Sequence, residues 1–329
     1  MFRQRCEQEI QYFTTFSNIK MSVAKGIKFN LQDLLRLLNM AAFLILFICP
    51  SHAQFTIPIS DGGTMYYEET GTGEPVLLLH GHTLDRRMWD GQVELLKDSF
   101  RVIVPDMRGY GKTSDPREGY QFTHMDDVLT LMDSLHIEKA HVVGLSMGAY
   151  VAGDMVALCP QRLLSCVMVS GETCRFTSPR YARNAQEVAK KRKDIASVKK
   201  DVEGYKRRRV NGLLGACYVA NREKIRPELE KEIMDWGAWQ ALHVTGRVYY
   251  GQDAWSALVK TKPAVPSLII YGENEHTSKG YSLRYLPNGE MVSVKLCGHM
   301  VNLEKPEEFN ELLLRWLLNH RSTGVQAIQ

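Results

Sequence analysis

The sequence predicts an α/β fold with a mostly parallel central sheet and helices on both of its faces. Short apolar runs, typical of strands buried on both faces, alternate with amphipathic segments of helical period. This alternation indicates parallel strands joined by right-handed crossovers. A long stretch without any strand pattern interrupts the alternation, which then resumes. The interruption indicates a helical insertion in a single sheet.

The expected strands follow one another in order along the chain. An opening hairpin is expected because Asp61-Gly62-Gly63, a typical turn sequence, joins the runs Phe55–Ile59 and Thr64–Glu69. The remaining expected strands are short and apolar: Pro75–Leu79, Phe100–Pro105, Lys139–Leu145, Leu163–Val169, Val265–Tyr271 and Met291–Leu296.

The expected helices of the core lie between these strands and at the end of the fold. They cover residues 86–99, 121–135, 147–158 and 306–320. Thr123 is a good first residue for the second helix, and Pro306 fits the first turn of the last one.

The insertion runs from about Cys174 to Lys262, directly after the sixth strand. Its expected helical stretches are 179–206, 227–243 and 253–259. We therefore expect five segments: an N-terminal extension (1–53), the first part of the core (54–173), a helical cap (174–262), the second part of the core (263–321) and a tail (322–329).

The N-terminal extension has the composition of a secretory signal peptide. Basic residues precede the run Leu34–Cys49, which is apolar apart from Arg36 and Asn39, and small residues follow at Ser51 and Ala53. This order predicts cleavage after Ala53 and export to the periplasm or the outside of the cell. An uncleaved membrane anchor is the less favoured alternative, because the uninterrupted part of the run is shorter than the roughly 20 residues that span a bilayer.

Composition and charge set broad limits on the partners of the chain. The 329 residues are 44% hydrophobic and 24% charged, as in an ordinary globular protein. The net charge of +4 is too small to indicate a nucleic-acid partner. Basic residues are dense between Arg180 and Arg209, within the predicted cap. A solvated helix face is the favoured interpretation, and attraction of an anionic substrate or surface is the alternative.

The cysteines match no metal site. Five would remain after cleavage at Ala53, and their spacing fits no known metal-ligand pattern. Cys159, Cys166 and Cys297 lie in apolar runs and are expected to be buried thiols. A bridge within the predicted cap would join Cys174 to Cys217.

The candidate nucleophile is Ser146. Gly144-Leu145-Ser146-Met147-Gly148 fits the pattern G-x-S-x-G and stands between an expected strand and an expected helix. Small residues must flank the serine because the turn is too sharp for larger side chains. The helix that follows offers free N–H groups and a positive dipole end to a developing oxyanion.

A serine nucleophile needs a general base and an acid that orients it. In proteins with this turn the acid and then the histidine follow the serine along the chain. His299 is the candidate base because it directly follows a strand, and Gly298 lets its loop pass close to the site. The candidate acid is Glu275, on the loop after the Val265–Tyr271 strand. Glu172, after the preceding strand, and Glu273 are the alternatives.

Two backbone N–H groups are expected to bind the oxyanion. One belongs to Met147, next after the serine, and the other to His82, on the loop after the Pro75–Leu79 strand. His80 and His82 also suggest a metal pair, but no carboxylate-rich run accompanies them. No metal and no cofactor is therefore expected.

From about Phe55 to Arg321 the chain resembles the α/β-hydrolase superfamily. The resemblance rests on the elbow, on His80-Gly81 and Gly298-His299, and on Asp106-Met-Arg-Gly-Tyr-Gly111, which is similar to the usual Asp-x-Arg-Gly-x-Gly of the superfamily. Trp89 is similar to an aromatic residue often found in its first helix. The chain departs from the usual Gly-x-x-Asp of the acid loop, because Glu275 stands where the aspartate is expected.

Together with the predicted signal peptide, the resemblance implies an exported serine hydrolase that cleaves a small carboxylic ester or related acyl compound. It is closest to capped esterases, lactonases, C–C bond hydrolases and the cofactor-free haloperoxidase group. C–C hydrolysis, haloperoxidase-like or oxygenase-like chemistry, and a binding protein with a degenerate triad are the alternatives. Epoxide hydrolases and haloalkane dehalogenases carry an aspartate where Ser146 stands. Aromatic residues late in the insertion are expected to pack between cap and core and in part to line an acyl pocket: Trp236, Trp239, Tyr249, Tyr250 and Trp255.

Overall fold

The computed structural model describes residues 53–117, 120, 122–173, 185–243, 254–275 and 279–322. The predicted signal sequence and its apolar run lie outside these residues, so cleavage and export stay predictions. Cys174, His276, Tyr249 and Tyr250 also lie outside them.

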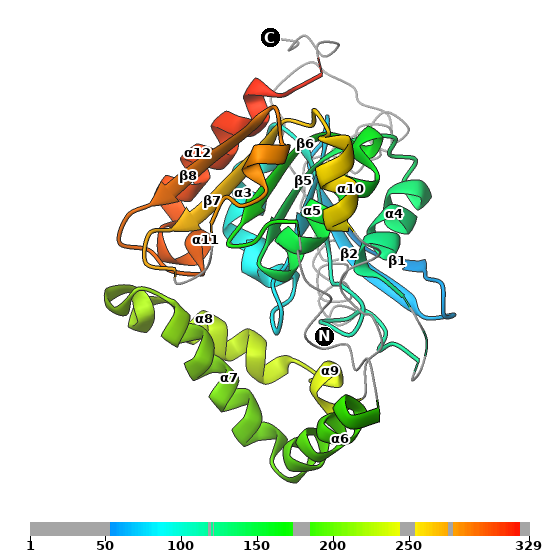
Figure 1. Ribbon diagram of the computed structural model, residues 1–329, viewed down its shortest axis with the longest axis vertical. Coiled ribbons are helices and arrows are strands. Elements are labelled where there is room, and N and C mark those ends of the chain that lie inside the picture. Colours follow the sequence, from blue (N-terminus) through cyan, green and yellow to red (C-terminus); the bar gives the residue numbers. More distant parts are fainter. Residues whose placement is uncertain are drawn as a thin grey trace, which may run out of the picture. The chain divides into compact units, whose positions relative to one another are not determined.

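Within the described residues, eight strands form one sheet in the order β1-β2-β4-β3-β5-β6-β7-β8 (Figure 1). The strands β1 and β2 form the predicted hairpin, in which Ile59 N donates to Gly63 O at 2.9 Å. The β2–β4 pair is also antiparallel, and every later pair is parallel, as predicted. The strand bounds are β1 Ala53–Pro58, β2 Thr64–Thr70, β3 Pro75–Leu79, β4 Arg101–Pro105, β5 Ala140–Leu145, β6 Leu163–Val169, β7 Ser267–Gly272 and β8 Gly289–Val294.

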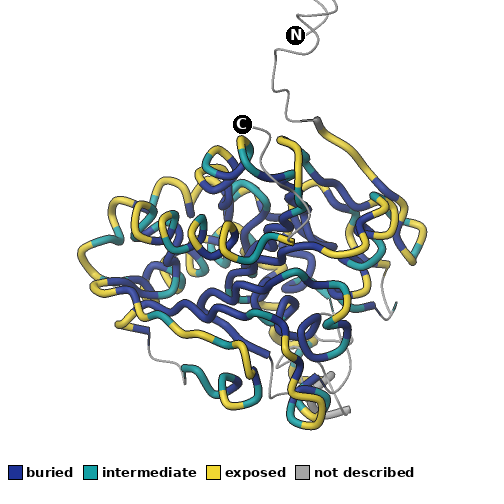
Figure 2. The backbone as a smooth tube through the Cα atoms, turned by 90° about the horizontal axis from the view of Figure 1, so that it is seen from above, coloured by how far each residue is buried: buried dark blue, intermediate teal, exposed yellow. Residues whose placement is uncertain are grey.

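Both faces of the sheet are covered by apolar side chains, as the continuous apolar runs predict. In β3, Leu77 and Leu79 join the core under α4, α5 and α10, whereas Val76 and Leu78 join the core under α3 and α12. All four side chains are fully buried. Figure 2 shows such buried segments running between exposed loops and helix faces. The core helices are α3 Asp90–Leu96, α4 His124–Ser134, α5 Met147–Leu158, α10 Ala254–Thr261, α11 Val301–Glu304 and α12 Pro306–Asn319.

The core helices begin close to the predicted residues. Thr123 caps α4 by accepting a hydrogen bond from Asp126 N at 3.0 Å, and Pro306 is the first residue of α12. The helix predicted at 86–99 is divided into the 3₁₀ turn η2 (Arg86–Trp89) and α3. Asp85 accepts from Arg87 N at 3.0 Å and thereby caps the 3₁₀ turn.

Among the described residues of the insertion, four helices and one 3₁₀ turn precede α10, and Figure 1 shows these four helices together, away from those that flank the sheet. The helix predicted at 179–206 is broken at Asp201. Its carboxylate accepts from Gly204 N at 2.8 Å and starts a second helix that continues to Ala216. Pro227 lies inside a helix rather than at its start. The elements are α6 Ala185–Lys200, α7 Val202–Ala216, η4 Val219–Asn221, α8 Arg222–Asp235 and α9 Trp239–Leu242.

The basic residues of the insertion lie mostly on exposed helix faces. On α6 the apolar Ile195 and Val198 are buried, whereas the charged residues around them are exposed. This arrangement is typical of a solvated amphipathic helix. The exposed basic residues of α6 and α7 include Lys190, Arg192, Lys193, Lys199, Lys200, Arg207 and Arg208.

The helix α10 falls within the predicted cap segment but packs on core helix α5. Its Trp255 contacts Tyr281 and Tyr285, with ring centroids 5.6 and 5.4 Å away. Trp255 therefore packs beside the segment that follows β7.

The described cysteines Cys159, Cys166, Cys217 and Cys297 are buried free thiols. Burial was predicted for three of them, and Cys217 is the described half of the bridge considered above. Over the same described residues, the structure contains no helix long and apolar enough to cross a membrane.

Three histidines are fully buried within the core: His80, His124 and His141. Burial lowers the pKa of His124 to about 3 and that of His141 to about 4, and it also lowers the pKa of His80. The folded protein therefore holds all three rings neutral at a pH where an unfolded histidine takes up a proton.

We expect the free energy of unfolding to decrease as the pH falls below about 6.5, the ordinary pKa of histidine. The unfolded chain then binds protons that the folded core excludes, and each such ring contributes a slope of up to about 1.4 kcal/mol per pH unit. His124→Phe should reduce this slope by about one proton in urea unfolding followed at pH 7, 6 and 5.

The comparison with the wild type is needed because Asp127 acts in the opposite direction. Burial raises its pKa to about 6, so its protonation favours the folded state over part of the same range. His136 lies at an exposed position, and His136→Asn is the control variant. An equal slope for His124→Phe and the wild type would contradict the prediction.

Candidate active site

Ser146 lies at the turn between β5 and α5, and its backbone is strained. Its φ of +54° and ψ of −106° fall in a region that residues other than glycine rarely adopt. The strand pairing continues through the turn, because Ser146 N donates to Val169 O at 2.8 Å. The structure thus places the predicted nucleophile at the carboxyl end of a central strand, where its side chain is partly exposed.

The two glycines of the motif stand where no side chain fits. A Cβ on Gly148 would lie 2.1 Å from Leu79 O, and one on Gly144 would lie 2.2 Å from Gly148 O. Both distances are too short for any larger residue without movement of the backbone. The first turn of α5 therefore lies directly against the end of β3.

His299 and Glu275 are in contact. Glu275 Oε1 lies 2.6 Å from His299 Nδ1, the geometry of a short, charge-assisted hydrogen bond. Glu275 is buried, and the His299 side chain is partly exposed. Their loops are also joined through the backbone, because Asn274 N donates to Cys297 O at 2.9 Å. The structure thus brings together the predicted base and the first of its candidate acids.

The elbow, the acid loop and the base loop follow parallel strands of the same sheet: β5, β7 and β8. The carboxyl ends of such strands meet at one edge, so the three candidate residues share that edge. No hydrogen bond joins the Ser146 hydroxyl to His299 among the described residues. In enzymes this bond often tightens only in the complex with substrate.

The alternative acid Glu172 has a different set of partners. It is fully buried, and its carboxylate accepts from Gly280 N at 2.5 Å, Ser282 N at 2.8 Å and Tyr271 Oη at 3.0 Å. It therefore anchors the segment that follows the acid loop. Glu273, the third candidate, is exposed.

The other described histidines that follow Ser146 lie elsewhere. His243 stacks on Trp239 in the insertion, with ring centroids 4.8 Å apart. His320 packs on Trp316 at the end of α12, with ring centroids 3.9 Å apart.

The predicted oxyanion donors come from two neighbouring segments. Met147 is the first residue of α5, so its N–H has no partner within the helix. His82 lies on the loop after β3. A Cβ on Gly81 would lie 3.6 Å from Leu145 O, so this loop passes beside the residue that precedes the serine.

An aromatic cluster covers the His82 side chain. His82 Nδ1 lies 2.5 Å from Tyr110 Oη, and Trp236 packs edge-on against the same imidazole with ring centroids 5.4 Å apart. Tyr110 and Trp236 are parallel, with their ring planes 9° apart. Trp236 directly follows α8, so the insertion meets the oxyanion loop through this cluster.

Both ring nitrogens of His80 make hydrogen bonds to backbone groups. Nε2 accepts from Met107 N at 2.9 Å, and Nδ1 lies 2.9 Å from Gly81 O, to which it must donate. Both nitrogens of His80 thus hold the loops that follow β3 and β4. No group of three or more histidine, cysteine, aspartate or glutamate side chains within the described ranges is arranged to hold a metal ion.

The Asp106–Gly111 stretch stabilises the loop beside the site. Asp106 is fully buried and accepts from Arg86 N at 3.0 Å and Lys112 N at 2.8 Å. A Cβ on Gly111 would lie 2.2 Å from Asp106 Oδ2, so a side chain there would displace the carboxylate. Gln240 of the insertion donates to Gly109 O at 3.4 Å. Asp106 thus holds this loop in place through its hydrogen bonds.

Two buried carboxylates join the insertion to the loops of the site, and the sequence indicated neither. Glu232 on α8 accepts from Asp85 N at 3.1 Å, and burial raises its pKa well above the ordinary value. Glu304 accepts from Gly298 N and Met300 N, each at 3.0 Å, and from Tyr218 N at 2.8 Å. The contacts that reach the other part of the chain, from Asp85 N to Glu232 and from Tyr218 N to Glu304, join residues far apart in the sequence, so no local sequence pattern reveals them.

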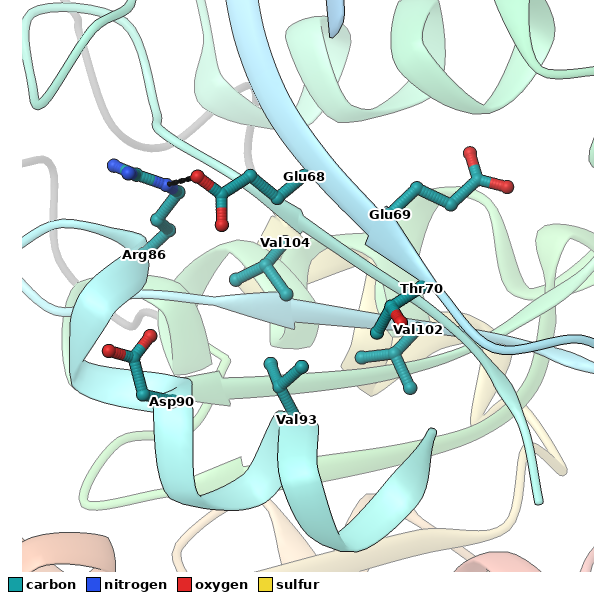
Figure 3. Close-up of a pocket in the computed structure, with 8 residues that line it drawn as sticks. All are labelled: Glu68, Glu69, Thr70, Arg86, Asp90, Val93, Val102 and Val104. Atoms are coloured by element: carbon teal, nitrogen blue, oxygen red, sulfur yellow. Dashed lines mark hydrogen bonds and ion pairs between the residues drawn. The ribbon is translucent and has the colours of Figure 1, made fainter. Parts of the chain in front are cut away.

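A separate small hollow lies between β2, β4 and the start of α3. Figure 3 shows Val93, Val102 and Val104 facing one another, with Arg86 bound to Glu68 at one side. None of the candidate site residues lines it. It lies between the sheet and α3, apart from the elbow.

Comparison with known proteins places these features in a family. Residues 74–306 match the family model described as alpha/beta hydrolase fold. The AB hydrolase superfamily protein YisY of Bacillus subtilis is 28% identical over 264 residues, which cover 77% of this chain and 95% of that protein.

Two solved structures are similar over nearly their whole length. A thermophilic esterase from Thermogutta terrifontis, solved with malate bound, superposes with a TM-score of 0.66 at 25% identity over 82% of this chain and 100% of its own. A bromoperoxidase from Bacillus anthracis gives a TM-score of 0.64 at 26% identity over 81% and 100%.

Proposed function

Because the chain belongs to the α/β hydrolase family, we propose that it is a serine hydrolase that cleaves a small carboxylic ester or related acyl compound through an acyl-enzyme. The observation that carries the proposal is the 2.6 Å contact of His299 with Glu275 at the sheet edge that also carries Ser146. A nucleophile, a base and an orienting acid at one edge are the parts that acyl transfer requires.

The proposed reaction begins with attack of Ser146 Oγ on the carbonyl carbon. His299 Nε2 takes the hydroxyl proton, while Glu275 holds Nδ1–H and stabilises the imidazolium. The N–H groups of His82 and Met147 stabilise the oxyanion of the tetrahedral intermediate. The C–O bond of the ester then breaks, and His299 returns the proton to the leaving alcohol. Water activated by His299 attacks the acyl-enzyme and releases the acid.

The aromatic cluster beside His82 supports a compact acyl group. Tyr110 and Trp236 are both buried, and together they cover the imidazole of the residue whose N–H would bind the oxyanion. A rigid aromatic wall next to the reacting carbonyl restricts the volume on that side. A small acyl chain is therefore the proposed substrate portion there.

The second candidate function is haloperoxidase-like chemistry at the same residues. The observation that favours it is the similarity to the Bacillus anthracis bromoperoxidase over 81% of this chain. In this proposal a short carboxylic acid acylates Ser146 with release of water, and hydrogen peroxide then attacks the acyl-enzyme to give a peroxyacid and free Ser146. The peroxyacid oxidises bromide to the brominating species and is itself reduced to the carboxylic acid. Bromination of an indicator dye that requires acetate and peroxide, and that exceeds ester hydrolysis, would favour this candidate.

We expect the wild-type protein to hydrolyse p-nitrophenyl acetate and to react covalently with a fluorophosphonate at Ser146. Ser146→Ala removes the attacking oxygen and should lower kcat by about 10⁴-fold or more, with loss of labelling. The measurements are initial rates and mass spectrometry of the labelled peptide. A folded wild-type protein that neither turns over nor labels would instead support a binding protein with a degenerate triad.

Substitution by glutamine is expected to affect turnover at Glu275 and stability at Glu172. Glu275→Gln cannot stabilise the imidazolium and should lower kcat by about 10²-fold or more with little change in Tm. Glu172→Gln should lower the free energy of unfolding by about 1–3 kcal/mol, because it weakens several buried hydrogen bonds, and change kcat less than about threefold. The reverse pattern in kinetics and thermal unfolding would transfer the role of acid to Glu172.

We also propose export after cleavage of the N-terminal extension, on the basis of its apolar run and small residues. N-terminal sequencing of the protein recovered from outside the cytoplasm should begin at Gln54. Protein recovered with residues before Leu34 still attached would overturn the cleavage proposal and favour the membrane anchor.

A further inference from the structure

We propose that Glu304 is a positioning residue for His299. Through Glu304, the orientation of this base depends on the position of the insertion relative to the base loop. The proposal rests on the proposed function, because it assumes that His299 is the base. It adds a residue that touches neither substrate nor reacting atoms and acts through the backbone on both sides of the histidine.

The carboxylate of Glu304 holds the base loop at two points. Its Oε2 accepts from Gly298 N and its Oε1 from Met300 N, each at 3.0 Å. These donors are the residues immediately before and after His299. Glu304 Oε1 and Oε2 therefore fix the backbone on both sides of His299, and this backbone determines the position and direction of the His299 side chain.

The same carboxylate binds the segment that joins α7 to α8. Glu304 Oε2 also accepts from Tyr218 N at 2.8 Å and from Asn221 Nδ2 at 3.1 Å. Asn221 Nδ2 in turn donates to Leu296 O at 3.0 Å, at the other end of the base loop. The insertion and the base loop thus both donate to the Glu304 carboxylate. The Asn221 side-chain amide joins them a second time through Leu296 O.

The histidine itself is bonded to the insertion. His299 N donates to Ala216 O, the last residue of α7, at 3.1 Å. The approach is close enough that a Cβ on Gly298 would lie 2.4 Å from Ala216 O and 2.7 Å from Cys217 Cα. A displacement of this segment therefore moves the backbone of the base loop directly.

The hydrogen bonds of the buried Glu304 carboxylate should hold the base loop rigidly. Glu304 is 2% exposed, so its carboxylate is removed from water and depends on the protein for hydrogen-bond donors. Hydrogen bonds to a charged acceptor are shorter and stronger than neutral ones. The neighbouring Cys217 is a buried thiol whose pKa burial raises. Since misplacement of a catalytic group by about 1 Å can cost about 10²-fold in rate, the loss of this anchor should appear in turnover.

The test compares Glu304→Gln and Glu304→Ala with Glu307→Gln, which removes the same charge from an exposed neighbouring position. Gln keeps the shape of the side chain but turns an N–H₂ group toward one set of N–H donors, so it should retain part of the function. We expect kcat for p-nitrophenyl acetate to fall about tenfold in Glu304→Gln and further in Glu304→Ala, with KM changed less than about threefold. Rates are normalised to the fraction of protein labelled at Ser146 after exhaustive fluorophosphonate treatment.

Normalisation separates positioning from stability. A purely structural role would lower Tm and the labelled fraction but leave kcat per labelled site unchanged, and that result would overturn the proposal. Glu307→Gln should match the wild type in every measurement. If Glu304→Ala fails to fold, Glu304→Gln decides the question by itself.

Asn221→Ala tests the dependence on the insertion. It removes one bridge to the base loop while Glu304 keeps its bonds to Gly298 and Met300. We expect kcat to fall, and the double variant with Glu304→Gln to lose less than the product of the two single effects, because both act on one network. Wild-type kcat in Asn221→Ala, or fully multiplicative effects, would overturn the coupling to the insertion.

A readout without turnover keeps the two proposals distinguishable. The proton shared by His299 and Glu275 should give a strongly downfield ¹H NMR signal in the wild type and in Glu307→Gln. In Glu304→Ala the signal should shift or disappear. Wild-type protein that neither hydrolyses the ester nor labels would refute the proposed function, and an unchanged signal in the variants would refute the role of Glu304.

Discussion

The close approach of the first turn of α5 to the end of β3 is the constraint on which the rest of the site depends. Leu79 O occupies the space where any side chain at position 148 would lie, so only glycine allows the helix to start there. The chain then has to reverse within one residue, which places Ser146 at a positive φ. The same contact puts the N–H of Met147 beside the loop that carries His82. The candidate nucleophile, the start of α5 and the loop proposed to bind the oxyanion thus depend on one backbone contact.

Much of the fold could be predicted because buried parallel strands and helix starts have local signatures. The β3 and β6 strands are apolar on both faces, and Thr123 caps a helix with its own side chain. The break at Asp201 was missed because the residues on both sides of it are charged and helix-forming. Its capping contact with Gly204 is local, but the surrounding pattern gave no reason to prefer it.

The site was predictable to the extent that chain order determines it. Ser146 and His299 are marked by glycines and by their positions after strands, whereas the choice between Glu275 and Glu172 depends on three-dimensional contacts. Both carboxylates follow strands that end at the same edge, and only their partners differ. The roles of Glu232 and Glu304 in attaching the insertion could not be predicted, because the contacts with Asp85 N and Tyr218 N join residues far apart in the sequence. These two contacts attach the insertion to the loops of the candidate site by buried hydrogen bonds.

The position of β1 bears on the proposed cleavage after Ala53. Its first ladder pair joins Ala53 to Glu69, and the next joins Gln54 to Glu68. A protease that cuts after Ala53 needs this stretch extended and unpaired in its own cleft, which is incompatible with a strand already bound to β2. Removal of the leader would therefore have to precede the docking of β1, while the chain is still unfolded on emergence from the membrane. The new N-terminal ammonium group would then lie on Gln54, opposite Glu68 in the sheet. Cleavage would therefore come first and the pairing of β1 with β2 second.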